Sequence, residues 1–300
     1  MIATSHQRRE NRNFYLWISP WIFGFLVFQV GPMLFSLYLS FMHWSPFGSS
    51  QWVGFGQYIR MLHDPLFWKS LKVTGYFTVL NVPLSMIAGL AVALLLQREV
   101  RGLRFFRTIY FLPRALTGVG VAYLWVYIFS PNFGLLDHLL SYVGVHGPAW
   151  LYSRTWVIPA FVLMDIWSAG GGMVIWLGAL QDVPKTLYEA ASLDGATSWS
   201  QFWRITLPMI SPVLLFNLVM GVIHSFEVFS NVYVMTAGGP GTSSLFYVLY
   251  LFKEAFPGFH FGYASALAWT LFLIILAFTL LIFRTSRTWV YYETEVEGRR

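Results

Sequence analysis

The sequence predicts an all-α polytopic membrane protein with six transmembrane helices. Of its 300 residues, 57% are hydrophobic and only 11% are charged, whereas soluble domains carry about 25% charged residues. Long runs with no charged residue, or with a single acid, recur at residues 14–41, 73–97, 115–136, 155–180, 205–236 and 255–283. Each run exceeds the roughly 20 residues that span a bilayer as a helix. Because no barrel-like alternation is present and lipid offers the backbone no partners, helices are predicted.

The first run, 14–41, is predicted to be a retained helix and not a signal peptide. Arginines precede it, as in a signal, but it is longer than an h-region of about 7–15 residues and no A-x-A site follows. The connection 42–69 is rich in Trp, Phe, Gly and Pro. We expect a compact lid on the membrane surface there, with interfacial anchors at Trp44, Trp52 and Trp68.

Lysine and arginine are distributed unevenly between the two predicted sides. Thirteen fall in the tails and in the loops 97–107 and 181–207, and five fall in the other loops. The richer side carries Arg8, Arg9, Arg12, Arg98, Arg101, Arg104, Arg107, Lys185, Arg204, Arg284, Arg287, Arg299 and Arg300. The positive-inside rule therefore predicts cytoplasmic termini. The net charge of +6 is explained by this topology and needs no nucleic acid partner.

These observations predict a simple domain organisation. Residues 1–13 and 285–300 are cytoplasmic tails, and 14–284 form a membrane domain whose core is 70–284. Between the third and fourth spans, 131–154 predicts a short amphipathic outer helix. No metal site is expected there, because His138 and His146 lack further ligands at metal spacing. The chain has no cysteine.

The cytoplasmic loop 181–207 predicts a helical hairpin. Pro184 suits the start of a helix over 185–193, and Asp194-Gly195 stops it, because glycine adopts the left-handed conformation readily. Thr197 or Ser198 can cap a second short helix that runs towards Pro208.

The hairpin is too small to bury its own apolar side chains, which are Leu187, Tyr188, Leu193, Trp199, Phe202 and Trp203. It needs another surface, either the membrane or a second protein. Ala190 and Ala191 form a thin face for close approach, and Glu189 offers a carboxylate to a cationic partner. A solvated loop without a partner is the alternative.

Polar residues inside the spans mark a candidate substrate pathway, because ionisable groups are costly in lipid. Asp165 lies in the fourth span with Trp167 and Ser168, before the glycines 170–172. The glycines permit close approach of a ligand or of a neighbouring helix. For Asp165 the alternatives are a structural hydrogen bond or pairing with Arg114.

The fifth span adds a second set of polar residues. His224, Glu227 and Asn231 are spaced to share one helix face, while Asn217 and Ser225 lie on another part. Such a stripe beside aromatic rings suits sugar hydroxyls. Asn81 is expected to satisfy the backbone that Pro83 loosens.

The chain has no machinery for catalysis or nucleotide hydrolysis. A P-loop needs Gly-Lys-Ser/Thr, but the four lysines follow Trp, Leu, Pro and Phe. Neither H-E-x-x-H nor G-x-S-x-G occurs. We therefore expect a transport subunit and not an enzyme.

The motif "EAASLDGA" followed by "ITLP" resembles the EAA motif of ABC importer permeases. The segments "RFFRTIYFLPRAL" (104–116), "YVMTAGGPGTSS" (233–244) and "FGYASALAW" (261–269) are similar to carbohydrate permeases of the MalF and UgpA type. The likeness covers about 70–285. The extra N-terminal helices and the large insertion of the maltose permease are missing.

The resemblance implies the ABC type I importer permease fold in a bacterial cytoplasmic membrane. It makes the loop a coupling helix that docks on an ATPase through Glu189, Ala190, Ala191, Asp194 and Gly195. It implies as partners a second permease of the MalG/UgpE type, an ATPase homodimer and an extracytoplasmic solute-binding protein. ATP and Mg²⁺ would be bound by the ATPase, and no cofactor by this chain.

The resemblance also implies where sugar is contacted. Aligned on the GGP sequence, the family's sugar-contacting positions fall near Gly221, His224, Ser225, Glu227 and Val228, and we add Asp165, Trp167, Ser168 and Gly171 to the pathway. The family's asparagines are replaced at 225, 227 and 228, so a different substrate or pose is expected.

Three alternatives to sugar import remain. An ABC permease for glycerol 3-phosphate or a polyol is one, although Arg114 is the sole basic residue of the spans and an anion would want more. A proton-driven transporter with Asp165, His224 and Glu227 as a relay is the second. A membrane scaffold without transport is the third.

Overall fold

The computed structural model describes residues 5–46, 48, 50–97, 102–116, 118–131 and 133–291. Within them, helices dominate and the strands form one antiparallel pair of two residues each, so the predicted all-α class is confirmed. The elements are α1 Ser5–Phe25, η1 Leu26–Val30, α2 Gly31–Leu39, β1 Met42–His43, β2 Gln51–Trp52, α3 Gly56–His63, α4 Pro65–Gln97, α5 Leu103–Ala115, α6 Gly118–Ile128, α7 Leu135–Ser141, α8 Val157–Ser168, η2 Ala169–Gly172, α9 Met173–Asp182, α10 Lys185–Leu193, α11 Ser198–Gln201, η3 Phe202–Thr206, α12 Leu207–Met209, α13 Ser211–Phe226, α14 Ser230–Met235, α15 Tyr247–Ala255 and α16 Phe261–Ser286.

Among the described residues, five helical stretches are long and apolar enough to cross a membrane, and the number is six if the bent pair Leu103–Pro113 and Gly118–Ile128 counts as one span. The five candidate spans other than the bent pair are Asn13–Leu39, Pro65–Gln97, Val157–Asp182, Ser211–Met235 and Phe261–Ser286. The predicted set of six is recovered with different ends. The second span begins earlier than residue 73, and its 33 residues give a helix of about 50 Å, longer than the roughly 30 Å hydrocarbon core.

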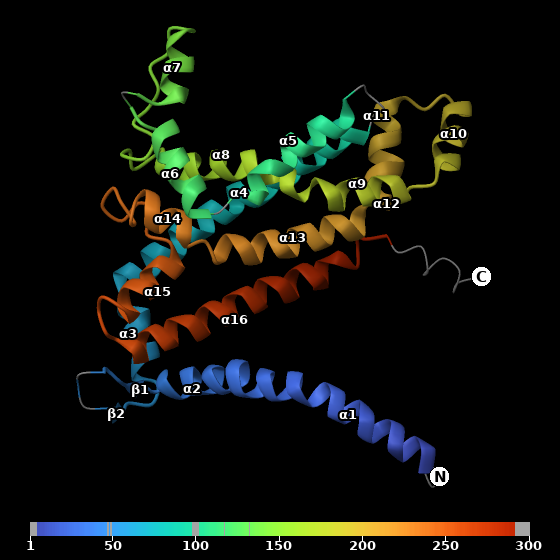
Figure 1. Ribbon diagram of the computed structural model, residues 1–300. Helices are drawn as coiled ribbons and strands as arrows, with labels where there is room; N and C mark the ends of the chain where they lie inside the picture. The colour runs from blue at the N-terminus through green and yellow to red at the C-terminus, as the bar shows by residue number, and fades with distance from the viewer. Residues whose placement is uncertain are drawn as a thin grey trace. The chain divides into compact units, whose positions relative to one another are not determined.

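The chain divides into two compact units, drawn with their elements in Figure 1. The first comprises Met1–Asp64 and Leu251–Thr270, and the second Pro65–Tyr250 and Leu271–Arg300. In the first unit the helix α1–η1–α2 is exposed along most of its length. Its π-helical turn η1 precedes Pro32, which has no N–H to give the carbonyl four residues back, so the helix widens there.

The described residues of the predicted lid up to Asp64 belong to the first unit. Gln57 donates to the Met42 carbonyl at 3.0 Å and the Tyr58 hydroxyl donates to Ser40 at 2.9 Å, so α3 is fixed to the residues that follow α2. The Tyr263 hydroxyl donates to the Asp64 carboxylate at 2.6 Å. The interfacial role of the lid tryptophans stays a prediction.

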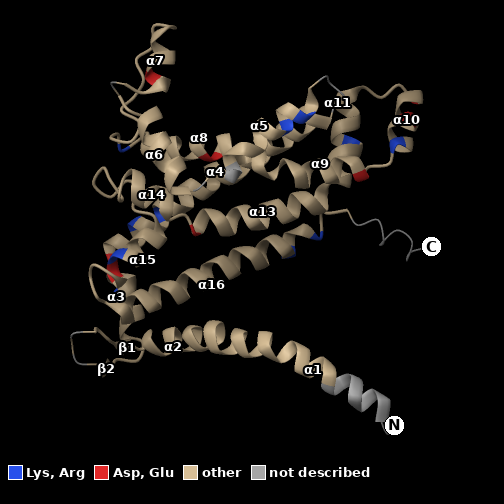
Figure 2. Cartoon of the chain, in the orientation of Figure 1, with Lys and Arg blue, Asp and Glu red and all other residues tan. Residues whose placement is uncertain are grey.

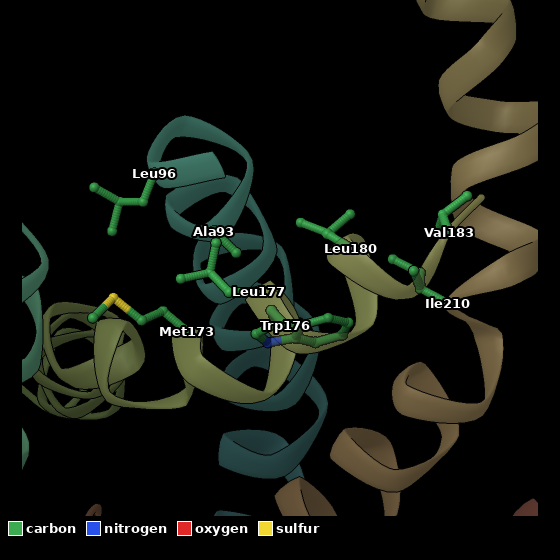
Figure 3. Packing of buried hydrophobic residues seen from close by; sticks show 8 residues of the cluster. All are labelled: Ala93, Leu96, Met173, Trp176, Leu177, Leu180, Val183 and Ile210. Carbon is green, nitrogen blue, oxygen red and sulfur yellow. The ribbon is translucent and has the colours of Figure 1, made fainter. Parts of the chain in front are cut away.

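The second unit is built around α4, which packs against α8, η2, α9 and α13. An apolar cluster of buried residues joins α4 to α9 and to the start of α13. Figure 3 shows the members of this cluster, which are Ala93, Leu96, Met173, Trp176, Leu177, Leu180, Val183 and Ile210. All eight are buried, so this end of the unit has a packed apolar core.

The third predicted span, 115–136, is wrong as a single helix. Within it the helix is α6, which ends at Ile128, and the α5 that precedes it ends at Ala115, with an angle of 93° between the two helices. Leu116, just after α5, has the extended conformation. Pro113 near the end of α5 and Gly118 at the start of α6 are the physical reason, because both weaken a continuing helix. The short outer helix predicted within 131–154 is present as α7.

The fourth and fifth spans are interrupted. The fourth tightens into a 3₁₀ turn at η2, where three glycines lower the preference for the α-helix. Gly170 lies against α5, and a Cβ there would be 2.6 Å from the Tyr110 carbonyl oxygen. The fifth span breaks after Phe226 and resumes at Ser230. The assignment of 1–13 and 285–300 as tails stays a prediction.

Candidate functional site

The hairpin of α10 and α11 forms as the sequence predicts. Pro184 caps α10, Asp194 ends it, and Gly195 adopts φ +78°, in the left-handed region that favours glycine. The Thr197 side chain caps α11 by accepting from the Ser200 amide at 3.3 Å. The second helix does not stop at Gln201, because the π-helical η3 and α12 continue it to Met209.

Hydrogen bonds hold the two arms of the hairpin together. Gln201 donates to the Ser192 hydroxyl at 3.0 Å and to the Ala196 carbonyl at 3.3 Å. The hydroxyls of Tyr188 and Thr206 share a hydrogen bond of 2.8 Å. The hairpin is therefore a defined shape and not a loose loop.

The apolar side chains of the hairpin are left largely uncovered, as predicted. Leu193 is 91% exposed, Trp199 72% and Trp203 51%. Leu187 is exposed too, whereas Tyr188 and Phe202 are half-buried against their own unit. Burying such surface stabilises by about 25 cal/mol per Å². The hairpin thus presents apolar area that a second surface can cover.

The five residues of the coupling motif lie on the outside of the hairpin. Glu189, Ala190, Asp194 and Gly195 are exposed and Ala191 is half-buried. No side chain of α10 is buried. The two chain segments that lead into and out of the hairpin contribute Val183 and Ile210 to the buried cluster (Figure 3), so the hairpin is joined at both ends to the packed residues of α9 and α13.

Basic residues gather at the same end of the second unit. Figure 2 shows Lys and Arg on α5, around α10 to α12 and at the end of α16. The end of α16 is tied to α13, because the Tyr291 amide donates to the Ser211 hydroxyl at 2.8 Å. This distribution supports a cytoplasmic hairpin. Arg98, Arg101, Arg299 and Arg300 lie outside the described residues, and so do the side chains of Arg8, Arg9 and Arg12.

A small cavity opens between α5, α6, α8 and α14 at the level of the fourth span. Its volume is about 210 Å³, and its polar lining comes from Asp165, Ser168 and Asn231. The structure thus brings two predicted pathway residues together with an asparagine from the far side of the break in the fifth span. Trp167 is part-exposed and contacts Trp125 edge-on at 5.7 Å between ring centroids.

Asn81 is the partner of the buried acid, which corrects its predicted role. Its amide donates to the Asp165 carboxylate at 2.9 Å, and Ser85 donates to the Asn81 carbonyl oxygen at 3.3 Å. The sequence signal for this pair is that each of the two spans carries a polar side chain that needs a hydrogen-bond partner inside the membrane. The alternative partner, Arg114, has its side chain outside the described residues.

The predicted polar face of the fifth span is wrong, because the helix ends at Phe226. Glu227 is the C-cap residue of α13 and its backbone is not helical. Because of this break, His224, Glu227 and Asn231 do not lie on one face of a continuous helix. His224 and Glu227 are exposed, whereas Ser225 is buried and Val228 is half-buried. Asn231 is the one of these that lines the cavity.

The predicted glycines divide by environment. Gly221 packs against α4, where a Cβ would lie 3.2 Å from Val82, so helix packing accounts for it. Gly171 is half-buried within η2 and does not line the cavity. In the described part of the chain, no group of three His, Asp or Glu side chains could hold a metal ion.

Comparison with known proteins assigns the family. The model of the family described as "Binding-protein-dependent transport system inner membrane component" matches residues 82–288. The chain belongs to this family. It is 39% identical to the "Probable ABC transporter permease protein YesP" of Bacillus subtilis, over 97% of this chain and 95% of that protein. It is 33% identical to the trehalose/maltose transport system permease protein MalF of Thermococcus litoralis, over 93% and 95%.

A solved structure extends the likeness to three dimensions. The fold of this permease matches a chain of a bacterial ABC transporter involved in the import of the acidic polysaccharide alginate, with a TM-score of 0.82 and 26% identity. The match covers 93% of this chain and 96% of that one. The same transporter has been solved in complex with a periplasmic protein that holds an alginate pentasaccharide. The ABC importer permease fold is therefore shown, with a chain that spans the membrane.

Proposed function

We propose that this permease is one membrane-spanning half of an ATP-driven importer for a sugar. The observation that carries the proposal is the hairpin of α10 and α11, which exposes apolar side chains and the Glu189 carboxylate on a firm buried base. Such a surface suits a partner protein. An ATPase homodimer is that partner, with ATP and Mg²⁺ bound there and no cofactor bound by this chain.

The other partners follow from the architecture of an importer. A second permease of similar fold completes the pathway, and a solute-binding protein delivers the ligand. The distribution of Lys and Arg supports cytoplasmic termini and a cytoplasmic hairpin, in a bacterial inner membrane.

A neutral saccharide is the substrate class that the chain favours. The intramembrane cavity offers a carboxylate, a hydroxyl and an amide, which exchange hydrogen bonds with sugar hydroxyls. No lysine or arginine is among the described residues that line it, which disfavours an anion such as glycerol 3-phosphate. Relatives named for trehalose/maltose and lactose support the same class, whereas others are named for sn-glycerol 3-phosphate.

Transport then follows from coupled motion. ATP binding brings the two ATPase subunits together, and each hairpin moves with the ATPase surface it contacts. Because Val183 and Ile210 join the hairpin to the cluster of α4, α9 and α13, the membrane helices move as well. The cavity thereby alternates between the two sides of the membrane, and hydrolysis resets it.

The first experiment is purification from native membranes in mild detergent, with every co-purifying chain identified by mass spectrometry. We expect an ATPase and a second permease, and ATP-dependent uptake of a neutral sugar when these chains are reconstituted with the solute-binding protein. A reproducibly monodisperse single chain whose uptake collapses with an uncoupler would overturn the proposal in favour of the proton-driven relay of Asp165, His224 and Glu227. Uptake of glycerol 3-phosphate in preference to sugars would refute the substrate class alone.

A further inference from the structure

A second and larger cavity lies beside α7, away from the hairpin and from the intramembrane cavity. It is formed by the end of α6, by α7 and by the loop that follows, and its volume is about 610 Å³. Sites for small molecules commonly measure about 300–1,000 Å³. Its lining is Tyr127, Pro131, Phe133, Gly134, Asp137, His138, Ser141, Val145, His146, Gly147 and Ala149.

The polar groups of this cavity are held in place. The Trp150 indole donates to the Asp137 carboxylate at 2.8 Å, and the Tyr142 hydroxyl lies 3.3 Å from Nε2 of His138. The loop passes so close at Gly147 that a Cβ would collide with the Asp137 carboxylate. The loop is therefore closed over an oriented carboxylate, which is a preorganised group for a ligand hydroxyl.

Aromatic rings stand open beside these polar groups. Phe133 is 78% exposed and Tyr127 65%. The ring of Trp150 contacts that of Phe129, with 5.6 Å between ring centroids. Phe129 in turn contacts Trp125, with 4.9 Å between ring centroids. Trp125 in turn contacts Trp167, the neighbour of a residue that lines the intramembrane cavity. A packed row of rings thus runs from Trp150, next to the lining residue Ala149, to Trp167, next to the lining residue Ser168.

The chemistry of the lining selects an uncharged, hydroxyl-rich ligand. Imidazoles and hydroxyls both donate and accept hydrogen bonds, the carboxylate accepts them, and ring faces cover the apolar side of a sugar. Among the described residues of the lining there is one acid and no lysine or arginine. The lining histidines belong to no metal-binding group in the described residues.

We propose that this cavity is an outer subsite that binds a neutral saccharide before it enters the membrane. The subsite rests on the proposed function for its position on the outer side and for the sugar class. It adds a second binding station to the pathway. Asp137, His138 and His146 supply the hydrogen bonds, and Tyr127 and Phe133 supply the stacking faces.

Covalent footprinting of histidines tests the subsite directly. The importer is reconstituted in lipid nanodiscs without the solute-binding protein, and is labelled with diethyl pyrocarbonate in the presence of maltose, trehalose or lactose. Because a pocket buries most of its ligand, we expect labelling of His138 and His146 to slow by at least about threefold. Labelling of the exposed His63 and His260, which do not line the cavity, is expected to stay constant.

Variants distinguish protection by a bound sugar from protection caused only by a change in the exposure of the loop. Phe133→Ala and Asp137→Asn are expected to remove the protection. Leu139→Ala, on the exposed side of the same helix and outside the lining, is expected to keep it. Glucuronate is expected to protect less than the neutral sugars, and equal protection would overturn the neutral class.

Three other outcomes decide the proposal. No protection by any sugar, with an importer that takes up sugar when reconstituted in proteoliposomes with the solute-binding protein, would overturn the subsite and leave the proposed function standing. Protection that appears only when the solute-binding protein is added would make this surface a protein docking site instead. Protection with an importer that shows no ATP-dependent uptake in proteoliposomes supplied with the solute-binding protein would support the subsite while refuting the proposed function.

Discussion

The hairpin of α10 and α11 and the intramembrane cavity present opposite cases within one unit. The hairpin is built from local signals: a proline, a glycine at φ +78° and a capping threonine, all within 14 residues of sequence from Pro184 to Thr197. The cavity instead collects Asp165, Ser168 and Asn231 from elements far apart in the chain. One leaves apolar side chains exposed, and the other gathers polar groups within the helices.

This difference indicates that the proposed coupling and the proposed substrate binding depend on different kinds of residue. A surface that binds a partner must keep apolar side chains exposed until the partner covers them, as Leu193 is at 91% exposure. A polar group in the membrane must find a partner within the protein, as Asp165 finds Asn81 at 2.9 Å. The comparison therefore predicts that hairpin variants uncouple transport without affecting the fold, whereas cavity variants affect the substrate.

The largest effect is expected for Glu189→Lys. The change reverses the charge of an exposed α10 side chain, so insertion and stability should be normal. Charge reversal within an interface costs about 2–5 kcal/mol when the partner charge is left unpaired, which corresponds to a loss of ATPase affinity of at least about tenfold. Sugar-stimulated ATP turnover in proteoliposomes measures this loss.

The matched control for this reversal is Asp182→Lys, an equally exposed acid at the end of α9 and outside the motif. It should retain most of the sugar-stimulated turnover. Normal turnover in Glu189→Lys would refute the coupling role of that residue. An equal loss in both variants would show that overall charge at this end matters, and not the motif.

The next effect is expected at the pair of Asp165 and Asn81. Asn81→Ala removes the hydrogen bond to the Asp165 carboxyl group and should lower sugar uptake several-fold, since a hydrogen bond contributes about 0.5–1.5 kcal/mol. The KM for sugar should rise while ATPase binding stays unchanged. Ser168→Ala removes a cavity hydroxyl whose own hydrogen bond is to the Asp165 backbone carbonyl and not to the carboxylate that Asn81 binds, and should have a smaller effect. Weaker ATPase binding in Asn81→Ala would contradict the separation of the two sites.

The sequence predicts the hairpin almost residue by residue, because each signal acts on its own neighbours. It predicts the spans well, because charge-free runs are long. It fails at the break after Phe226, where helical spacing suggested one polar face but the backbone leaves the helix. It also misses the pairing of Asn81 with Asp165, since the contact joins residues 84 positions apart and one sequence alone does not show which spans are neighbours.

A smaller effect separates exposed from buried apolar residues at the same end of the unit. Leu193→Ser removes an exposed side chain and should weaken ATPase binding several-fold without lowering the unfolding temperature. Leu180→Ala, in the buried cluster, should lower the free energy of unfolding by about 2–5 kcal/mol. Thermal unfolding of the purified chain in detergent, with ATPase binding measured alongside, compares the two. A destabilised Leu193→Ser would mean that this side chain is buried within its own chain.

The smallest expected effects come from the glycines of η2. Gly170→Ala places a methyl 2.6 Å from the Tyr110 carbonyl and should cost about 1–3 kcal/mol through overpacking. Gly172→Ala meets no atom within 4 Å and should be neutral or stabilising by up to about 1 kcal/mol. Unfolding temperatures of the two variants measure the difference. Equal destabilisation would show that the turn itself requires glycine at both positions.

Site-specific crosslinking tests the central claim most directly. The chain has no cysteine, so Ala190→Cys introduces a single attachment point for a photoactivatable crosslinker on the exposed face of α10. In native membranes we predict a crosslink to an ATPase subunit, identified by mass spectrometry, and its loss when Glu189→Lys is added. A crosslinker that labels only lipid or a permease chain in the assembled importer would contradict the account.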